Sequence, residues 1–267
     1  MNNNPIGIFD SGIGGLTVAK AVSKLLPKEE IIYFGDTAHL PYGDKSTAAI
    51  QSYSIKICNL LLEKSCKIIL IACNSASAAA FNLVKEYVGS KAIVLNVIDP
   101  AVEYIGEYYS QKKIGLIGTK RTVLSDVYNQ KIVELNKSIE LKSLATPLLA
   151  HIIEEGFATN RVGDEVVYQY LSDDILDDIE ALILGCTHYP LIKDKIDSFY
   201  ASQVEVIDSS EVVAISLKEK LETHNLLSDN KNTIHKFYVS DYTKSFEEST
   251  KIFFGEKVIL KHYKLWE

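Results

Sequence analysis

Short apolar runs alternate with helix-like patterns along almost the whole chain, and this alternation predicts the architecture. Strands are expected at residues 6–9, 31–34, 68–72, 93–97, 114–117, 141–145, 181–184, 204–207, 236–239 and 258–261. Between most of them, the spacing of apolar residues has the period of a helix. Examples of the expected helices are residues 16–26, 47–63, 78–88, 123–135, 164–176 and 211–221. Strands that alternate with helices form parallel sheets covered on both faces, so the pattern predicts an α/β fold.

Polar residues directly follow many of the expected strands. They are Asp10-Ser11, Asp36-Thr37, Cys73-Asn74-Ser75, Thr119, Cys186-Thr187-His188 and Asp208-Ser209. In open parallel sheets, ligands bind outside the carboxyl ends of the strands. The sequence therefore predicts that its polar chemistry gathers on that edge.

Two pairs of similar segments suggest an internal duplication. The segment I-G-I-F-D-S at 6–11 resembles I-G-L-I-G-T at 114–119, and I-L-I-A-C at 69–73 resembles L-I-L-G-C at 182–186. The two separations are nearly equal, which predicts two related α/β halves. We expect one domain to comprise residues 1–97 with 208–267, and the other residues 98–207. The alternative is that any two α/β segments look alike over so short a match.

Composition narrows the class of protein. The 267 residues carry a formal net charge of −7 without a basic stripe, which argues against a nucleic-acid-binding surface. No apolar run approaches the ~18 residues of a membrane-spanning helix. The first residues, M-N-N-N-P, show neither the positive charge nor the apolar core of a secretory signal. We therefore expect a cytoplasmic protein that binds neither nucleic acid nor membrane.

The chain has four cysteines, which are expected to be reduced in the cytoplasm. The absence of any C-x-x-C pair weakens both a zinc-ribbon and a thioredoxin-like interpretation. Cys58 lies in a helical pattern and Cys66 precedes a strand, so both are interpreted as buried small hydrophobes. Cys73 and Cys186 each lie where a strand gives way to a helix, and a helix amino terminus favours thiolate over thiol. A thiolate can act as a nucleophile, a metal ligand or a proton acceptor.

Three nearby sequence features help to decide whether these thiols act as nucleophiles, metal ligands or proton acceptors. His188 follows Cys186 closely enough to act as its acid/base or charge partner, although a zinc site would normally need three or four protein ligands. Asp10 opens the glycine-rich loop D-S-G-I-G-G, where backbone can approach a ligand closely. The loop lacks the G-x-x-x-x-G-K-[ST] pattern, and a carboxylate at its mouth would repel phosphate. The stretch G-D-T-A-H-L-P-Y-G at 35–43 is either an ordinary surface turn or a loop that presents N–H groups to an anion.

Together these motifs resemble those of the glutamate racemase family, within the cofactor-independent aspartate/glutamate racemase superfamily. The matching segments are D-S-G-I-G-G at 10–15, G-D-T-A-H-L-P-Y-G at 35–43, A-C-N-S-A-S at 72–77, I-G-L-I-G-T-K-R-T at 114–122, P-L-L-A-H-I-I-E-E-G at 147–156 and G-C-T-H-Y-P-L at 185–191. They span nearly the whole chain in the order of the family. The departures are Thr146 where relatives often have cysteine, His151 at a usually apolar or proline position, and Ser75 in place of a common threonine.

The resemblance implies two flavodoxin-like parallel-sheet domains related by a pseudo-twofold axis, with the substrate in the cleft between them. It also implies interconversion of L- and D-glutamate for peptidoglycan precursors, with no cofactor, no metal and a homodimeric state. By motif, Cys73 and Cys186 are the two proton-transferring bases, supported by Asp10 and His188 respectively. The implied substrate-binding residues are Ser11, Pro41, Tyr42, Gly43, Asn74, Ser75, Thr187 and Glu154.

Other functions remain open on sequence grounds. Aspartate or another acidic amino acid could be the racemised substrate. A non-catalytic two-lobed anion-binding protein would need no thiols at the strand ends, and a thiol hydrolase would need only one nucleophile.

Overall fold

Parallel strand pairing produces two separate sheets in the computed structural model, which describes residues 2–267. The strands are β1 (Ile6–Asp10), β2 (Ile31–Gly35), β3 (Ile68–Ile71), β4 (Ile93–Asn96), β5 (Lys113–Gly118), β6 (Glu140–Ala145), β7 (Ala181–Gly185), β8 (Glu205–Ile207), β9 (Lys236–Val239) and β10 (Leu260–His262). Within the described residues, one sheet has the order β10-β9-β2-β1-β3-β4 and the other β6-β5-β7-β8. Every pairing is parallel, so the predicted α/β fold with two parallel-sheet halves is confirmed.

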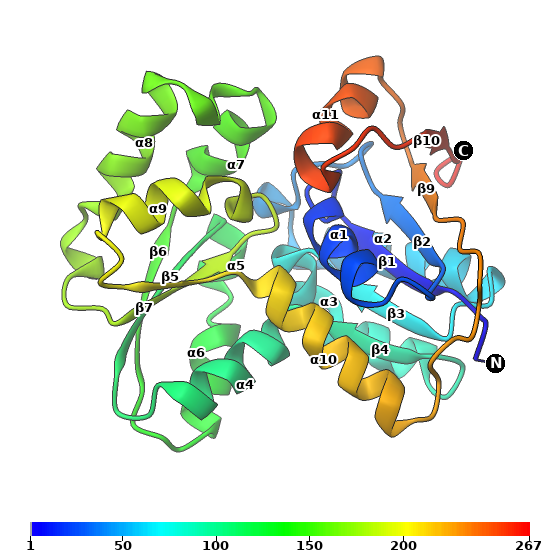
Figure 1. The fold of residues 1–267 in the computed structure, drawn as a ribbon, viewed down its shortest axis with the longest axis horizontal. Helices are drawn as coiled ribbons and strands as arrows, with labels where there is room; N and C mark the ends of the chain where they lie inside the picture. Colours follow the sequence, from blue (N-terminus) through cyan, green and yellow to red (C-terminus); the bar gives the residue numbers. More distant parts are fainter. Residues whose placement is uncertain (1) are drawn as a thin grey trace.

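Helices cover both sheets and lie between them. They are α1 (Leu16–Leu25), α2 (Thr47–Glu63), α3 (Asn74–Val88), α4 (Ile98–Tyr108), α5 (Lys120–Leu124), α6 (Val127–Glu134), α7 (Pro147–Glu154), α8 (Arg161–Leu171), α9 (Lys193–Phe199), α10 (Ser209–Thr223) and α11 (Lys244–Phe254). Figure 1 shows the two sheets in two lobes, with α10 starting where the lobes meet and running along the lower side of the lobe that contains β1. We call the part built on β1 the first lobe and the part built on β5 the second lobe. None of the helices in residues 2–267 combines the length and apolar character needed to cross a bilayer.

Three expected helices differ from the observed ones by more than two residues at one end or are interrupted. The helix expected at 78–88 begins earlier, at Asn74, directly after Cys73. The helix expected at 123–135 is broken, because Asp126 has the left-handed backbone conformation (φ 57°) between α5 and α6. The helix expected at 164–176 starts earlier, where Asn160 accepts hydrogen bonds from two backbone N–H groups, and it ends at Leu171 before a separate short turn.

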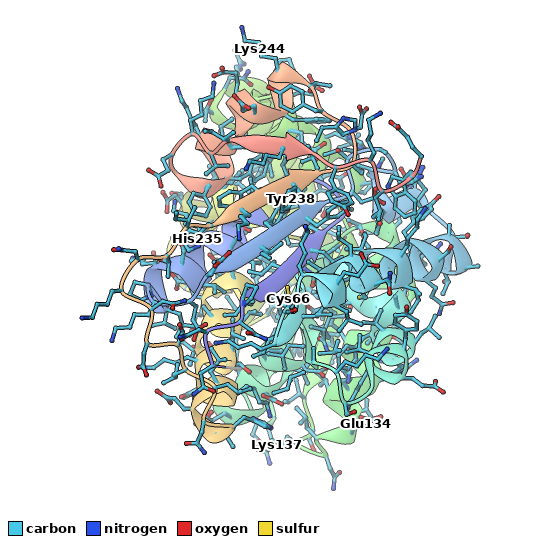
Figure 2. The ribbon with its side chains drawn as sticks, turned by 90° about the vertical axis from the view of Figure 1, so that its right-hand side faces the viewer. Cys66, Glu134, Lys137, His235, Tyr238 and Lys244 are labelled. Atoms are coloured by element: carbon cyan, nitrogen blue, oxygen red, sulfur yellow. The ribbon has the colours of Figure 1, made fainter. Side chains whose placement is uncertain are left out.

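The edge of the first sheet is built from the end of the chain. β9 lies between β2 and β10, and Figure 2 shows Tyr238 on β9 above the neighbouring strand of the amino-terminal region. Residues 236–262 thus rejoin the lobe that begins at β1. The assignment of 1–97 with 208–267 to one domain, and of 98–207 to the other, stays a prediction.

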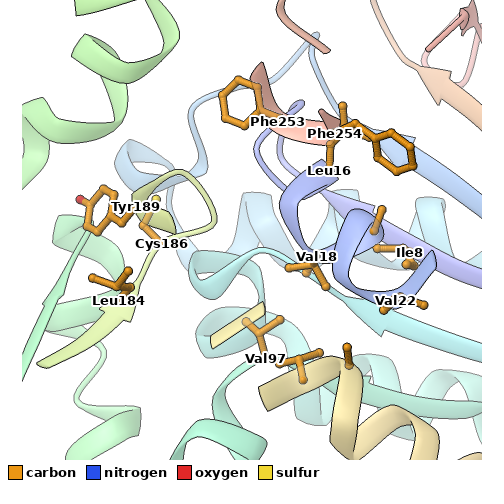
Figure 3. Close-up of a cluster of buried hydrophobic side chains, with 14 of the residues drawn as sticks. Ile8, Leu16, Val18, Val22, Val97, Leu184, Cys186, Tyr189, Phe253 and Phe254 are labelled. Atoms are coloured by element: carbon orange, nitrogen blue, oxygen red, sulfur yellow. The ribbon is translucent and has the colours of Figure 1, made fainter. Parts of the chain in front are cut away.

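One apolar cluster extends through both lobes. Figure 3 shows Ile8, Leu16 and Val22 of the first lobe in the same cluster as Leu184 and Tyr189 of the second. Full burial of each such side chain contributes about 1.5–3 kcal/mol relative to exposure. Cys186 belongs to this cluster too, so its sulfur lies at the border between the core and the polar edge.

Candidate active site

Strand register brings Asp10 and Cys73 to the same edge of the first sheet. Phe9 of β1 is level with Ile71 of β3, so the residues that follow both strands lie side by side. In the second sheet, Gly118 of β5 is level with Gly185 of β7, which places Thr119 next to Cys186. The carboxyl ends of the two sheets therefore present one cysteine each.

Asp10 is fully buried behind the glycine-rich loop. Its Oδ2 accepts hydrogen bonds from the N–H groups of Gly12 (3.2 Å) and Gly15 (3.0 Å). Its Oδ1 has no hydrogen-bond partner among residues 2–267. Burial raises the pKa of Asp10 above its usual value, against the lowering effect of the His188 charge and the backbone N–H groups. The carboxyl group can therefore hold a proton at a higher pH than an exposed aspartate.

Cys73 caps the amino terminus of α3 and is buried, with its Sγ 3.7 Å from Oγ of Ser11. Burial raises the pKa of the Cys73 thiol, and the negative charge of Asp10 raises it further. The N–H of Ala76 and the Ser11 hydroxyl act in the opposite direction. Desolvation therefore outweighs the helix-terminus effect expected from the sequence, and Cys73 is a thiol in this closed arrangement.

A line of three side chains lies on the second lobe. Nδ1 of His188 is 3.5 Å from Sγ of Cys186, and Nε2 is 2.8 Å from Oε1 of Glu154. Burial by itself lowers the pKa of His188, but the negative charge and hydrogen bond of Cys186, together with Glu154, raise it well above its usual value. Burial likewise raises the pKa of Glu154, but the hydrogen bond and charge of His188 lower it overall. The arrangement holds the imidazole between a carboxylate and a sulfur, and these two neighbours favour its protonated form.

A small cavity of about 40 Å³ lies between the lobes. Its lining includes every site residue expected from the sequence except Asp10: Ser11, Pro41, Tyr42, Gly43, Cys73, Asn74, Ser75, Glu154, Cys186, Thr187 and His188. Asp10 lies behind this wall, next to Cys73. The volume holds only a few water molecules at about 10–15 Å³ each.

A larger hollow of about 850 Å³ lies beside β4, lined by residues such as Lys85, Lys91 and Lys220. It contains neither Cys73 nor Cys186. The chemistry of the lining, rather than the volume, therefore identifies the smaller cavity as the candidate site.

Direct contacts join the two lobes beside this cavity. Ser75 and Thr119 share a hydrogen bond of 2.9 Å, and the Thr17 hydroxyl donates to the carbonyl oxygen of Thr187 at 2.9 Å. Gly14 lies so close to His188 that a Cβ atom would be 2.4 Å from Cε1 of the ring. Only glycine allows this approach, which explains one glycine of the D-S-G-I-G-G loop.

Asp36 is a buried group for which no role in the site was expected from the sequence. Its carboxylate accepts hydrogen bonds from the hydroxyl groups of Tyr42 (2.6 Å) and Ser240 (2.7 Å) and from Nε1 of Trp266 (2.8 Å). The Tyr42 hydroxyl is therefore held by Asp36, while other atoms of Tyr42 line the cavity. Thr119 and His151 also line the cavity, although neither was named as a substrate-binding residue. Thr119 was expected at this edge because it directly follows a strand, whereas no signal in the sequence placed His151 at the cavity.

Residues 2–267 contain no group of three or more His, Cys, Asp or Glu side chains placed to hold a metal ion. The polar lining can bind carboxylates. Asn74, Ser75 and Thr187 line the cavity together with the two cysteines and offer amide and hydroxyl groups as hydrogen-bond donors.

Comparison with known proteins gives consistent matches over nearly the full length. A family model described as Asp/Glu/Hydantoin racemase matches residues 16–216. A glutamate racemase of Chlorobaculum parvum is 40% identical over 256 residues, covering 96% of this chain and 94% of the relative. A crystal structure of glutamate racemase from Francisella tularensis in complex with D-glutamate has a TM-score of 0.92 at 39% identity, covering 100% of this chain and 99% of the other. A glutamate racemase structure from Bacillus anthracis has a TM-score of 0.94 at 34% identity, covering 99% of both chains.

Proposed function

Because this chain belongs to the Asp/Glu/Hydantoin racemase family, we propose that it interconverts L- and D-glutamate without a cofactor. The family resemblance expected from the motifs is confirmed by a family model that matches residues 16–216 and by a relative that covers 96% of this chain. Glutamate is the proposed substrate because the full-length relatives are glutamate racemases and one related structure holds D-glutamate.

The single observation that supports this proposal most is the placement of Cys73 and Cys186. Both sulfur atoms line one cavity, and they come from opposite lobes. Racemisation removes the Cα proton from one face of the substrate and returns a proton to the other face. One base cannot reach both faces unless the substrate turns over, whereas two bases on opposite walls can.

In the proposed step, one sulfur is a thiolate and takes the Cα proton, while the other is a thiol and gives its proton to the opposite face. The reverse reaction exchanges the roles. Asp10 is the proposed acid/base partner of Cys73. His188, which Glu154 holds in place, is the proposed source of positive charge next to Cys186. Burial and the negative charge of Asp10 raise the pKa of the Cys73 thiol, so Cys73 is the proposed proton donor of the resting state, and the His188 imidazole, 3.5 Å from the Cys186 sulfur, is the proposed charge partner of the other base.

The carbanion that forms at Cα needs stabilisation, because an amino-acid Cα–H is a very weak acid. We assign this task to fixed donors in the closed cavity, where water is excluded. Ser11, Asn74, Ser75 and Thr187 supply side-chain and backbone donors. The Pro41-Tyr42-Gly43 turn, which Asp36 holds in place, supplies the wall beside them.

The test is incubation of L-glutamate with the protein in D₂O without any added cofactor. Chiral chromatography should show D-glutamate, and mass spectrometry should show deuterium at Cα of the product. A non-catalytic anion-binding protein would give neither signal. A thiol hydrolase would instead form a covalent acyl intermediate on one cysteine. Parallel incubation with L-aspartate separates the two acidic substrates, and faster turnover of aspartate would overturn the choice of glutamate.

Several wider expectations belong to the same proposal. The product D-glutamate would supply peptidoglycan synthesis in the cytoplasm, and the active form would be a homodimer, which light scattering of the purified protein tests. One domain would comprise residues 1–97 with 208–267, and the other residues 98–207. The hinge would lie where the chain passes from one domain to the other, at residues 97–98 and 207–208. Hydrogen exchange that differs between open and substrate-bound protein at residues 97–98 and 207–208 would support these boundaries.

A further inference from the structure

One hydrogen bond joins the two lobes directly behind the cavity. The hydroxyl of Tyr128, on α6 of the second lobe, donates to Oδ1 of Asn74, the first residue of α3 in the first lobe, at 2.7 Å. Both side chains are almost fully buried, at 1% and 2% exposure. Asn74 lines the cavity, whereas Tyr128 does not.

The other end of the same amide is unused. Nδ2 of Asn74 is buried and has no hydrogen-bond partner within the described part of the chain. A buried N–H group without an acceptor is costly, so such groups are rare outside functional sites. Since Oδ1 faces Tyr128, Nδ2 is the end that is left for a ligand in the cavity.

We propose that Tyr128 is a positioning residue, which fixes the orientation of the Asn74 amide so that Nδ2 donates to a carboxylate oxygen of the amino-acid substrate. This inference rests on the proposed function and adds to it a residue outside the cavity. Tyr128 touches no reacting atom and acts only through Asn74.

The alternative orientation of the amide shows why fixation matters. An asparagine amide can turn over by exchanging its oxygen and nitrogen ends, and a tyrosine hydroxyl can either donate or accept. If Tyr128 accepted from Nδ2, the amide oxygen would face the substrate carboxylate, and two acceptors would repel each other. Burial raises the pKa of Tyr128, so the hydroxyl keeps the proton that it donates.

The break between α5 and α6 determines where the Tyr128 hydroxyl lies. Asp126 adopts the left-handed conformation between α5 and α6, and Tyr128 lies in the first turn of α6. Because Tyr128 and Asn74 belong to different lobes, their bond requires the closed arrangement. The amide is therefore fixed for carboxylate binding when the lobes close over the substrate.

The experiment is a double-mutant cycle on the full-length protein with Tyr128→Phe, Asn74→Ala and the double variant. Steady-state racemisation of glutamate gives kcat and KM for each. Tyr128→Phe keeps the ring and removes only the hydroxyl, so we expect KM to rise about three- to tenfold, with kcat changed by less than about twofold. In the Asn74→Ala background the same change should alter KM by less than about twofold, because the partner is gone. If Asn74→Ala is too slow to assay, calorimetric titration with glutamate replaces KM for all four proteins.

The matched control is Tyr104→Phe, in which the lost hydroxyl donates to Glu205 at 2.8 Å on the surface. This variant should leave both kinetic constants unchanged. An equal effect of Tyr128→Phe in both backgrounds, or no effect in the presence of Asn74, would overturn the inference and leave the proposed function standing. Absence of glutamate racemisation by the unaltered protein would overturn the proposed function, and the inference with it.

Discussion

Nε2 of His188 lies 2.8 Å from Oε1 of Glu154, and this contact directs the other ring nitrogen toward the sulfur of Cys186. The first lobe has no counterpart of this imidazole next to Cys73 within the residues described; a buried carboxyl group, Asp10, is the neighbour there. The two sulfur atoms therefore have different electrostatic surroundings, a positive charge on one side and a titratable acid on the other.

Glu154→Gln should shift the pH profile of the reaction. The substitution removes a negative charge but retains a hydrogen-bond acceptor, so the pKa of His188 should fall toward its usual value. The imidazolium is then lost at a lower pH, and the alkaline decline of kcat/KM should move in the acidic direction, with kcat reduced about tenfold or more. Rate profiles from neutral to alkaline pH measure this shift. Glu155→Gln, at the adjacent exposed position, is the control, and equal profiles for the two variants would contradict the role of Glu154.

Asp10→Asn should lower kcat by about tenfold to a hundredfold and change KM little, since Asp10 lies behind the cavity wall and supports Cys73. The amide oxygen can still accept from the N–H groups of Gly12 and Gly15, so the loop should keep its shape. Steady-state kinetics in both directions measure the effect. A rise in KM alone would assign Asp10 to substrate positioning instead.

The same substitution should change the dependence of stability on pH. The pKa of Asp10 is raised in the folded protein, so its stabilising contribution is present below the ordinary aspartate pKa and is lost as pH rises through the folded value. Asp10→Asn carries no charge at any pH. Its urea midpoint should therefore exceed that of the unaltered protein at neutral pH, and the difference should shrink on acidification. A difference that grows toward acidic pH would contradict the raised pKa.

Cys73→Ala and Cys186→Ala should each lower kcat at least about 10³-fold in both directions, because each removes one of two required proton carriers. Cys58→Ala is the matched control: this thiol is buried in the core of the first lobe, and burial raises its pKa, which makes it inert. It should keep kcat and lose about 1 kcal/mol of unfolding free energy. Full turnover by either active-site variant would refute the two-base scheme.

Gly14→Ala should separate the lobes or displace His188. The added Cβ would lie 2.4 Å from Cε1 and 2.6 Å from Nδ1 of the ring, so one of them must move. A misplacement of about 1 Å can cost about a hundredfold in kcat. Gly12→Ala, in the same loop, would meet its nearest atom, Cδ2 of Leu40, only at 3.5 Å and should cause a much smaller loss. Equal kcat values for the two variants would show that the contact with His188 is dispensable.

The arrangement of the two cysteines could be anticipated because it depends on a local rule. Parallel strands end on a common edge, so a residue that follows a strand is placed there whatever the rest of the chain does. The rule correctly predicted that Cys73, Cys186 and the loop at residues 35–43, which ends in Pro41-Tyr42-Gly43, lie at the cavity wall. It also applied to Thr119, which lines the cavity although no role was assigned to it from sequence.

Other features depend on packing between distant segments and leave no local pattern. Asp36 and Trp266 are 230 positions apart, and nothing in either neighbourhood indicates their hydrogen bond. The raised pKa of Cys73 could not be anticipated for a related reason: the helix terminus is visible in the sequence, whereas the desolvation that outweighs it arises from the assembled lobes. The break at Asp126 was missed because the apolar spacing continues across it.

The outer strands of the first sheet have a consequence for synthesis. β9 pairs with β2, and β10 pairs with β9, so these pairings form only after residues 236–262 have left the ribosome. The sheet of β5 to β8 is complete well before that point, whereas β2 has an open hydrogen-bonding edge in the nascent polypeptide. Such an edge is a template for wrong pairing with other chains. Chaperone capture during translation should therefore concentrate on the amino-terminal lobe and cease once Phe237 is available to dock.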